Sequence, residues 1–186
     1  MLIPLRLSVY TDEQLMQRAA HGNDRAFEEL YNRHARRLQG FFARRLGEDS
    51  DLAADFMHDA FLRLYAARET YREGSSFRAW LYTIAYNLCK NHKRKPHPLL
   101  LSQEEESIYA RDIEIDIDDA IFHDALRDVL RRLPEVYAML FSLHYEEELT
   151  VPQIAQITEL PEGTVKSRLH KAMNIIKQQL KQYENH

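Results

Sequence analysis

The sequence predicts an all-α protein of two small helical domains joined by an acidic linker, and three observations support this fold class. Only five of the 186 residues are glycine and six are proline, which leaves little material for the turns of a β-rich fold. Strong helix formers such as Ala, Leu, Glu and Arg are plentiful. Apolar residues recur at helical spacing except in one acidic stretch. That stretch divides the chain into residues 1–95, a linker of residues 96–119, and residues 120–186.

Four helices are expected before residue 96. The first follows Thr11, an N-cap residue with Gln14 three positions later, which is the capping-box pattern. The second is marked by apolar residues between Ala26 and Phe41. The third begins at Ser50 and is expected to bury a stripe of apolar side chains, namely Leu52, Phe56, Ala60, Phe61 and either Leu64 or Tyr65.

A loop separates the third helix from the fourth. Residues 72–76 form a polar run that contains a glycine, which is typical of a turn. The fourth helix begins at Phe77 and is stopped by Pro96 and Pro98, because the residue before a proline disfavours helical geometry. Its Trp80 fits the core better than an exposed position.

The linker mixes prolines, acidic residues and isolated apolar residues, a composition that does not support a packed core. Residues 112–118 alternate at period two and would also suit a short strand, but no second strand is visible to pair with it. After the linker, an amphipathic helix runs from Ala120 to Leu133 and ends at Pro134. Another helix covers residues 135–145.

The sequence pattern at the end of the chain predicts a helix-turn-helix. The second helix of this motif enters the major groove of DNA. Thr150 begins a short helix, with Gln153 completing a second capping box, and a turn around Glu159 leads into the final helix. The final helix carries an apolar stripe at Val165, Leu169, Ala172, Ile176 and Leu180. Its other side is polar and basic, which suits either DNA or the solvated face of an ordinary helix bundle.

The formal net charge of −4 hides an uneven distribution. Basic residues gather at residues 33–45, 90–95 and 166–181, and acidic residues crowd into residues 104–119. Local patches set the field that a phosphate backbone feels, so this pattern predicts nucleic-acid-facing surfaces on either side of an acidic segment.

The chain shows no sign of secretion or of a resident cofactor. Its single cysteine, Cys89, excludes an internal disulfide framework, suits a reducing compartment and is expected to be a small buried side chain. The first ten residues lack the features of a signal peptide, and no apolar run approaches the roughly 20 residues of a membrane span. A cytoplasmic protein without membrane insertion, metal or cofactor is expected.

Two segments resemble one protein family. Residues 55–95, DFMHDAFLRLYAARETYREGSSFRAWLYTIAYNLCKNHKRK, resemble region 2 of bacterial sigma factors, and residues 133–173, LPEVYAMLFSLHYEEELTVPQIAQITELPEGTVKSRLHKAM, resemble their region 4. Their order and the short acidic linker resemble the extracytoplasmic-function (ECF, group 4) type of the sigma-70 family. The resemblance implies a subunit without catalysis that binds core RNA polymerase, directs it to the −35 and −10 promoter elements and assists DNA melting.

The resemblance implies that the third helix docks on the coiled coil of the largest polymerase subunit, while the polymerase flap is a further expected contact. The docking residues would be Asp55, His58, Asp59, Leu62 and Arg63. A mixed polar and apolar face suits a reversible interface. Without the resemblance, a solvated helix face would be the simpler interpretation, and a metal site would need further ligands.

The loop and the fourth helix correspond to the part of the family that binds the −10 element. The expected contacts are Tyr71, Ser75, Ser76, Phe77, Arg78, Asn87, Lys90 and Arg94. Aromatic stacking along a basic track holds single strands at roughly 1–3 kcal/mol per stacked base, and the loop would receive a flipped base. Tyr86 departs from the arginine of many relatives, which leaves the duplex contact there open.

The final helix corresponds to the −35 reader. Ser167, His170 and Lys171 match base-reading positions, and Thr164, Lys166 and Arg168 match mainly backbone-contacting positions. The base preferred by His170 depends on its tautomer. Relatives usually place glycine where this chain has Glu159, and a non-glycine residue there costs roughly 1 kcal/mol or forces another turn. An altered turn with the motif retained is expected.

Two other functions compete with the sigma factor. A conventional DNA-binding regulator would not need the segment that resembles region 2. A metal-dependent nuclease would have to use the carboxylates of residues 112–119, which lack a scaffold, a nucleophile–base arrangement or a phosphate loop. Relatives are commonly held inactive by an anti-sigma factor, so such a partner is also expected. The linker would act either as a nucleic-acid mimic in a basic channel or as a plain tether.

Overall fold

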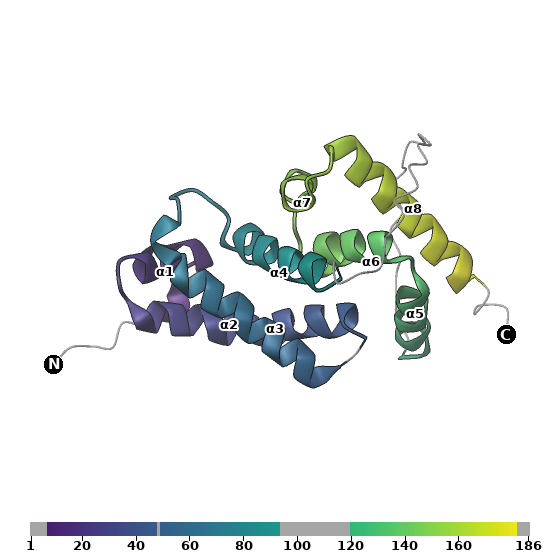
Figure 1. Cartoon of the computed structure of the whole chain (residues 1–186). Helices are drawn as coiled ribbons and strands as arrows, with labels where there is room; N and C mark the ends of the chain where they lie inside the picture. The colour runs from purple at the N-terminus through teal and green to yellow at the C-terminus, as the bar shows by residue number, and fades with distance from the viewer. Residues whose placement is uncertain (1–6, 48, 94–119, 182–186) are drawn as a thin grey trace. The chain divides into compact units, whose positions relative to one another are not determined.

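The computed structural model describes residues 7–47, 49–93 and 120–181, and these ranges contain helices and short connections but no strand (Figure 1). The predicted all-α class is therefore confirmed. The chain divides into two compact units, Met1–Pro98 and Leu99–His186. The predicted linker and its alternative strand lie outside the described residues.

The first unit is a bundle in which α1 and α3 pack on α2, and α4 packs on α2 and α3. The predicted capping box at the start of α1 is confirmed, because the Thr11 amide donates to Gln14 Oε1 at 3.0 Å and the Gln14 amide donates to Thr11 Oγ1 at 3.3 Å. The elements are η1 (Leu7–Val9), α1 (Asp12–Ala20), α2 (Asp24–Arg45), α3 (Ser50–Ala66), η2 (Arg68–Thr70) and α4 (Phe77–Lys93).

The core of the first unit is rich in aromatic rings. Phe41 packs edge-on against Phe42 and against Tyr82, with ring centroids 5.7 Å and 5.3 Å apart. Cys89 is buried, as expected for a small core side chain. Trp80 is only half-buried, so its predicted core position is confirmed in part.

One predicted stripe needs correction. In α3 the buried residues are Ala53, Met57, Ala60, Phe61 and Leu64. Leu52 and Phe56 are half-buried, because the stripe that faces the core begins one position later than predicted and these two side chains flank it.

The second unit places α5, α6 and α7 against α8. Its elements are α5 (Ala120–Arg132), α6 (Glu135–Phe141), a π-helical turn η3 (Ser142–Glu146), α7 (Val151–Thr158) and α8 (Glu162–Leu180). The helix predicted for residues 135–145 is thus α-helical only as far as Phe141. The predicted stripe of α8 is confirmed, since all of its members are buried: Val165, Leu169, Ala172, Ile176 and Leu180.

The buried stripe of α8 forms a core with α5. Val129 and Leu133 pack with Ala172, Ile176 and Leu180, and half-buried residues of α6 such as Tyr137 close this cluster. Because the core takes one side of α8, the other side is left for solvent or a partner. Among the described helices, none has both the length and the apolar character needed to cross a membrane.

Candidate nucleic-acid and polymerase interface

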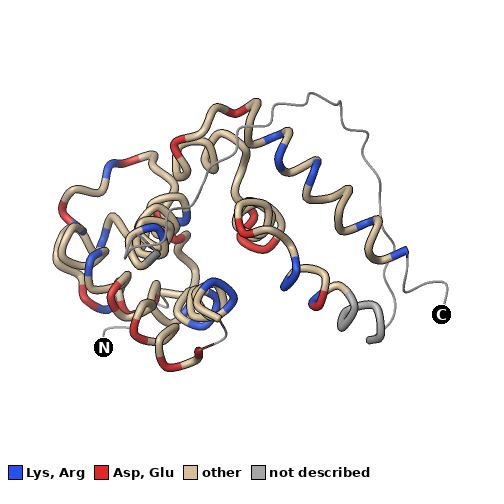
Figure 2. The backbone as a smooth tube through the Cα atoms, turned by 45° about the vertical axis from the view of Figure 1, so that its right-hand side comes forward, with Lys and Arg blue, Asp and Glu red and all other residues tan. Residues whose placement is uncertain are grey.

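The outward side of α8 is polar and basic. Lys166 and Lys171 are exposed, and a half-buried group lies beside them, namely Thr164, Ser167, Arg168 and His170. No Asp or Glu follows Glu162 in this helix. Figure 2 shows Lys and Arg recurring along it as far as its last turn. The predicted −35 residues therefore lie together on one element, which favours contact with a negatively charged partner.

Local contacts orient several of these side chains. Nε2 of His170 lies 3.0 Å from Nδ2 of Asn174, and because the amide nitrogen is a donor, this pairing leaves the ring proton on Nδ1. The Ser167 hydroxyl donates to the Thr164 carbonyl at 3.1 Å and keeps its own oxygen as an acceptor. The Lys171 ammonium lies 6.0 Å from the centre of the Tyr137 ring, at the outer limit of a cation–π contact.

The turn between α7 and α8 corrects a prediction. Glu159 itself adopts the left-handed conformation, with φ 59° and ψ 29°, and its amide donates to the Ala155 carbonyl at the end of α7. The expected change of turn is therefore wrong. The chain keeps the geometry that glycine usually provides, at a backbone cost of roughly 1 kcal/mol. The Thr150 amide donates to Gln153 Oε1 at 2.9 Å at the other end of α7, as the predicted capping box requires.

The predicted docking residues form one outward stripe of α3. Asp55, His58, Asp59, Leu62 and Arg63 recur at spacings of three and four, which places them on one side of the helix. Leu62 is 69% exposed and is the apolar member of this otherwise charged or polar stripe. The Asp59 carboxylate accepts two hydrogen bonds from Arg63, at 2.9 Å and 3.0 Å, and Nε2 of His58 lies 3.0 Å from the Tyr31 hydroxyl.

The loop before α4 is held by aromatic contacts. The Tyr71 ring stacks on Trp80 with centroids 5.4 Å apart, and its hydroxyl donates to the Ser75 carbonyl at 2.5 Å. Burial, together with the carboxylates of Glu13 and Asp12, raises the pKa of Tyr71 to about 12. Tyr71 is therefore a partly covered ring.

The serines and polar residues of this region have distinct positions. Ser75 and Ser76 are half-buried, and Ser76 Oγ accepts from the Ala79 amide at 3.2 Å, so Ser76 caps α4. Asn87 and Lys90 are exposed along α4, and Arg78 is half-buried. Arg94, which was predicted with them, lies outside the described residues.

The structure also corrects the prediction that Phe77 contacts the −10 element. Its side chain is 0% exposed and its ring lies 5.1 Å from the imidazole of His34, so it belongs to the core and offers no face to a base. Phe77 is the first residue of α4, and there its ring packs against His34 of α2 instead of facing the loop.

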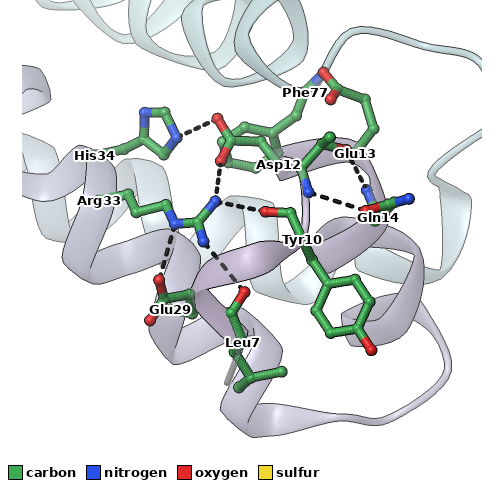
Figure 3. Close-up of polar contacts among 10 residues, drawn as sticks. Leu7, Tyr10, Asp12, Glu13, Gln14, Glu29, Arg33, His34 and Phe77 are labelled. Carbon is green, nitrogen blue, oxygen red and sulfur yellow. Dashed lines mark hydrogen bonds and ion pairs between the residues drawn. The ribbon is translucent and has the colours of Figure 1, made fainter. Parts of the chain in front are cut away.

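The sequence prediction missed a polar network that is centred on Arg33. Arg33 donates to the Leu7 and Tyr10 carbonyls, at 3.2 Å and 2.9 Å, and to the carboxylates of Asp12 and Glu29 (Figure 3). The confirmed capping box at Thr11 was the one available sequence signal that the residues beside it are fixed.

The same network reaches the core. Nε2 of His34, itself buried, lies 2.7 Å from the Asp12 carboxylate. This hydrogen bond is the main reason that the pKa of Asp12 lies below its usual range, although burial of the carboxylate opposes the shift. Asp12 is therefore ionised at neutral pH and joins α1 firmly to α2.

Comparison with known proteins follows the division of the chain. Residues 30–97 match the sequence model of sigma-70 region 2, and residues 123–175 match that of sigma-70 region 4. Together the two matches cover more than half of the chain. An RNA polymerase sigma-H factor of Pseudomonas aeruginosa is 30% identical over 177 residues, which are 89% of this chain and 91% of that relative. The chain belongs to the sigma-70 family.

Further relatives define the type of sigma factor. An ECF RNA polymerase sigma-E factor of Haemophilus influenzae is 28% identical over 182 residues, 91% of this chain and 95% of the relative. The ECF sigma-E factor of Escherichia coli K12 is 29% identical over 178 residues. This sigma factor is thus of the ECF type and directs promoter-specific transcription initiation. Sigma factors are not enzymes in the usual sense.

Solved structures share the fold. The structure of CnrH in complex with the cytosolic domain of CnrY is similar with a TM-score of 0.66 and 23% identity, over 91% of this chain and 97% of CnrH. The sigma factor RpoE of Bartonella quintana, in complex with the anti-sigma factor NepR, is similar with a TM-score of 0.62 and 22% identity, over 83% of this chain and 96% of RpoE.

Proposed function

We propose that this sigma factor divides promoter recognition between two units, with residues 1–95 binding core polymerase and the −10 element and residues 120–186 binding the −35 element. The observation that carries the proposal is the outward face of α8, which is basic and free of acidic residues beyond Glu162 and lies opposite a fully buried apolar stripe. A helix fixed in this way presents its polar side chains to the major groove without rearrangement.

The −35 element is recognised by two kinds of contact. Ser167, His170 and Lys171 contact base edges. With Nε2 of His170 facing the Asn174 amide, the Nδ1–H of His170 and the Lys171 ammonium are donors and favour the acceptors of guanine, adenine N7 or thymine O4. Contacts to phosphates come from Thr164, Lys166 and Arg168 and fix the register.

The −10 element is received by the loop at residues 71–76 and by α4. The stacked Tyr71 and Trp80 rings provide aromatic surface, and the serines provide polar contacts to an unstacked base. The backbone of the separated strand follows Arg78, Asn87, Lys90 and Arg94. Phe77 supports this site from the core and does not contact DNA.

Core polymerase binds the outward stripe of α3, where exposed Leu62 supplies an apolar contact among charges. Its coiled coil occupies this stripe, and the flap contacts the second unit. An anti-sigma factor is a further partner and would hold the protein inactive; the complex of RpoE with the anti-sigma factor NepR supports such a partner. The protein has no catalytic activity of its own and acts in the cytoplasm, where polymerase and chromosomal DNA are found.

The docking assignment is tested by replacing Asp59 and Leu62 together with alanine. Both side chains point outward, so the double variant should fold normally and lose binding to core polymerase. The matched control is Asp51→Ala, in the exposed first turn of the same helix. Binding is measured by fluorescence anisotropy of a labelled sigma factor titrated with core enzyme. Retention of normal affinity by the double variant would refute the docking assignment.

A further inference from the structure

The start of α4 is capped from another helix. The Phe77 amide donates to Glu13 Oε1 at 3.3 Å, although the two residues are 64 positions apart in the sequence. The amides of a helix's first turn have no acceptor within the helix, and a carboxylate at that end is also favoured by the helix dipole. Ser76 caps one of these amides in α4 and Glu13 caps another.

The part of α1 that carries Glu13 is held in place by contacts of the neighbouring residue. Its neighbour Asp12 is held by Arg33 at 3.1 Å and by His34 at 2.7 Å, both from α2 (Figure 3). The His34 ring also packs on Phe77. Therefore α1 cannot move away from α2, on which Phe77 at the start of α4 also packs, without breaking these contacts.

The carboxylates of Glu13 and Asp12 also influence Tyr71, at the other end of the loop. Burial and the nearby carboxylates of Glu13 and Asp12 raise the pKa of Tyr71.

We infer that Glu13 is a positioning residue for −10 recognition: its carboxylate holds the first turn of α4, and with it the loop at residues 71–76, in the conformation that receives an unstacked base. This inference rests on the proposed role of the loop. In this role Glu13 itself contacts no DNA.

The test uses the full chain with core polymerase and fork-junction promoter DNA that carries a single abasic site at each −10 position in turn. The wild-type complex should bind the intact fork roughly tenfold more tightly than the fork that lacks the captured base. Glu13→Ala should lose most of this preference. Glu13→Gln should keep it, because the amide oxygen still accepts from Phe77, and Glu13→Asp should lose it despite its charge, because its side chain is shorter.

Two controls separate positioning from general damage. Glu28→Ala removes a carboxylate of the exposed side of α2 and should behave like wild type. Trp80 is the only tryptophan of the chain and stacks on the loop's Tyr71, so acrylamide quenching of its fluorescence should rise in Glu13→Ala and not in Glu13→Gln.

The outcomes are distinct. If the wild type shows a position-dependent preference and Glu13→Ala keeps it, the inference about Glu13 is overturned and the role of the loop stands. Equal loss in Glu13→Ala and Glu13→Gln would also overturn it, because a neutral acceptor for the Phe77 amide would then not be enough to position the loop. If no abasic position matters to the wild type, the proposed role of the loop itself fails.

Discussion

Replacing Arg33 with alanine should destabilise the first unit, because this side chain joins three segments. Its guanidinium donates to the carbonyls of Leu7 and Tyr10 and pairs with Asp12 and Glu29. Asp12 would retain His34 and the Leu7 carbonyl would retain the Tyr10 amide, but removal of Arg33 breaks the hydrogen bonds that tie η1 and Tyr10 to α2.

The magnitude follows from these contacts. Each hydrogen bond to a carbonyl contributes about 1 kcal/mol to the free energy of unfolding. The Arg33 side chain is 26% exposed, so its two ion pairs are screened in part and contribute roughly 0.5 kcal/mol each. The sum is a loss of about 3 kcal/mol. Arg33→Lys should lose about 2 kcal/mol, since an ammonium keeps charge but cannot reach four acceptors as a planar fork does.

The assay is urea denaturation followed by the fluorescence of Trp80, which lies in α4 and reports on the first unit alone. The control is Arg36→Ala, an exposed arginine of the same helix, which should change the free energy of unfolding by no more than about 0.5 kcal/mol. A loss from Arg33→Ala below about 1 kcal/mol, or one equal to that of the control, would refute the stabilising role of the network.

Three further predictions concern both units. Lys171→Ala should weaken binding of the holoenzyme to its −35 element by roughly 1–3 kcal/mol, and Lys177→Ala should not; an equal loss on every DNA sequence would reassign Lys171 to a phosphate. Leu169→Ala should lower the opening free energy of α8, measured by hydrogen exchange, by roughly 2–4 kcal/mol, because Leu169 is buried; unchanged protection would contradict the core assignment. The pKa of the Asp12 carboxylate is lowered in the folded protein. Its ionised form therefore stabilises the folded first unit fully above the unfolded pKa of roughly 3.9, and this contribution is lost as the pH falls through the lower folded pKa. Asp12→Asn should remove this acid-dependent part of the unfolding curve, and an unchanged pH profile would argue against the pairing with His34.

The helices and their caps were predictable because both depend on local sequence. The stripe of α8 needed only apolar residues at helical spacing, and the capping box at Thr11 needed only two side chains three positions apart. In α3 the pattern was ambiguous, since Leu52 and Phe56 alternate with Ala53 and Met57 as candidates for the core. The larger side chains suggested the wrong edge of the stripe.

Features that depend on tertiary contacts were not predictable. The aromatic ring of Phe77 suits stacking on a base in isolation, but its direction is set by packing against His34. Glu159 could either adopt left-handed geometry or change the turn, and nothing local decides between these costs. The cap from Glu13 to Phe77 joins residues 64 positions apart, so no local pattern reveals it.

The proposed function requires two separate surfaces of one chain to direct polymerase to two promoter elements. Purified protein would be mixed with bacterial core polymerase that lacks any sigma factor, and the 5′ ends of transcripts from fragmented genomic DNA of its source would be sequenced. We expect discrete start sites that share two upstream motifs at a fixed spacing. The absence of protein-dependent starts, with DNA binding by the protein alone, would contradict it and favour a conventional DNA-binding regulator.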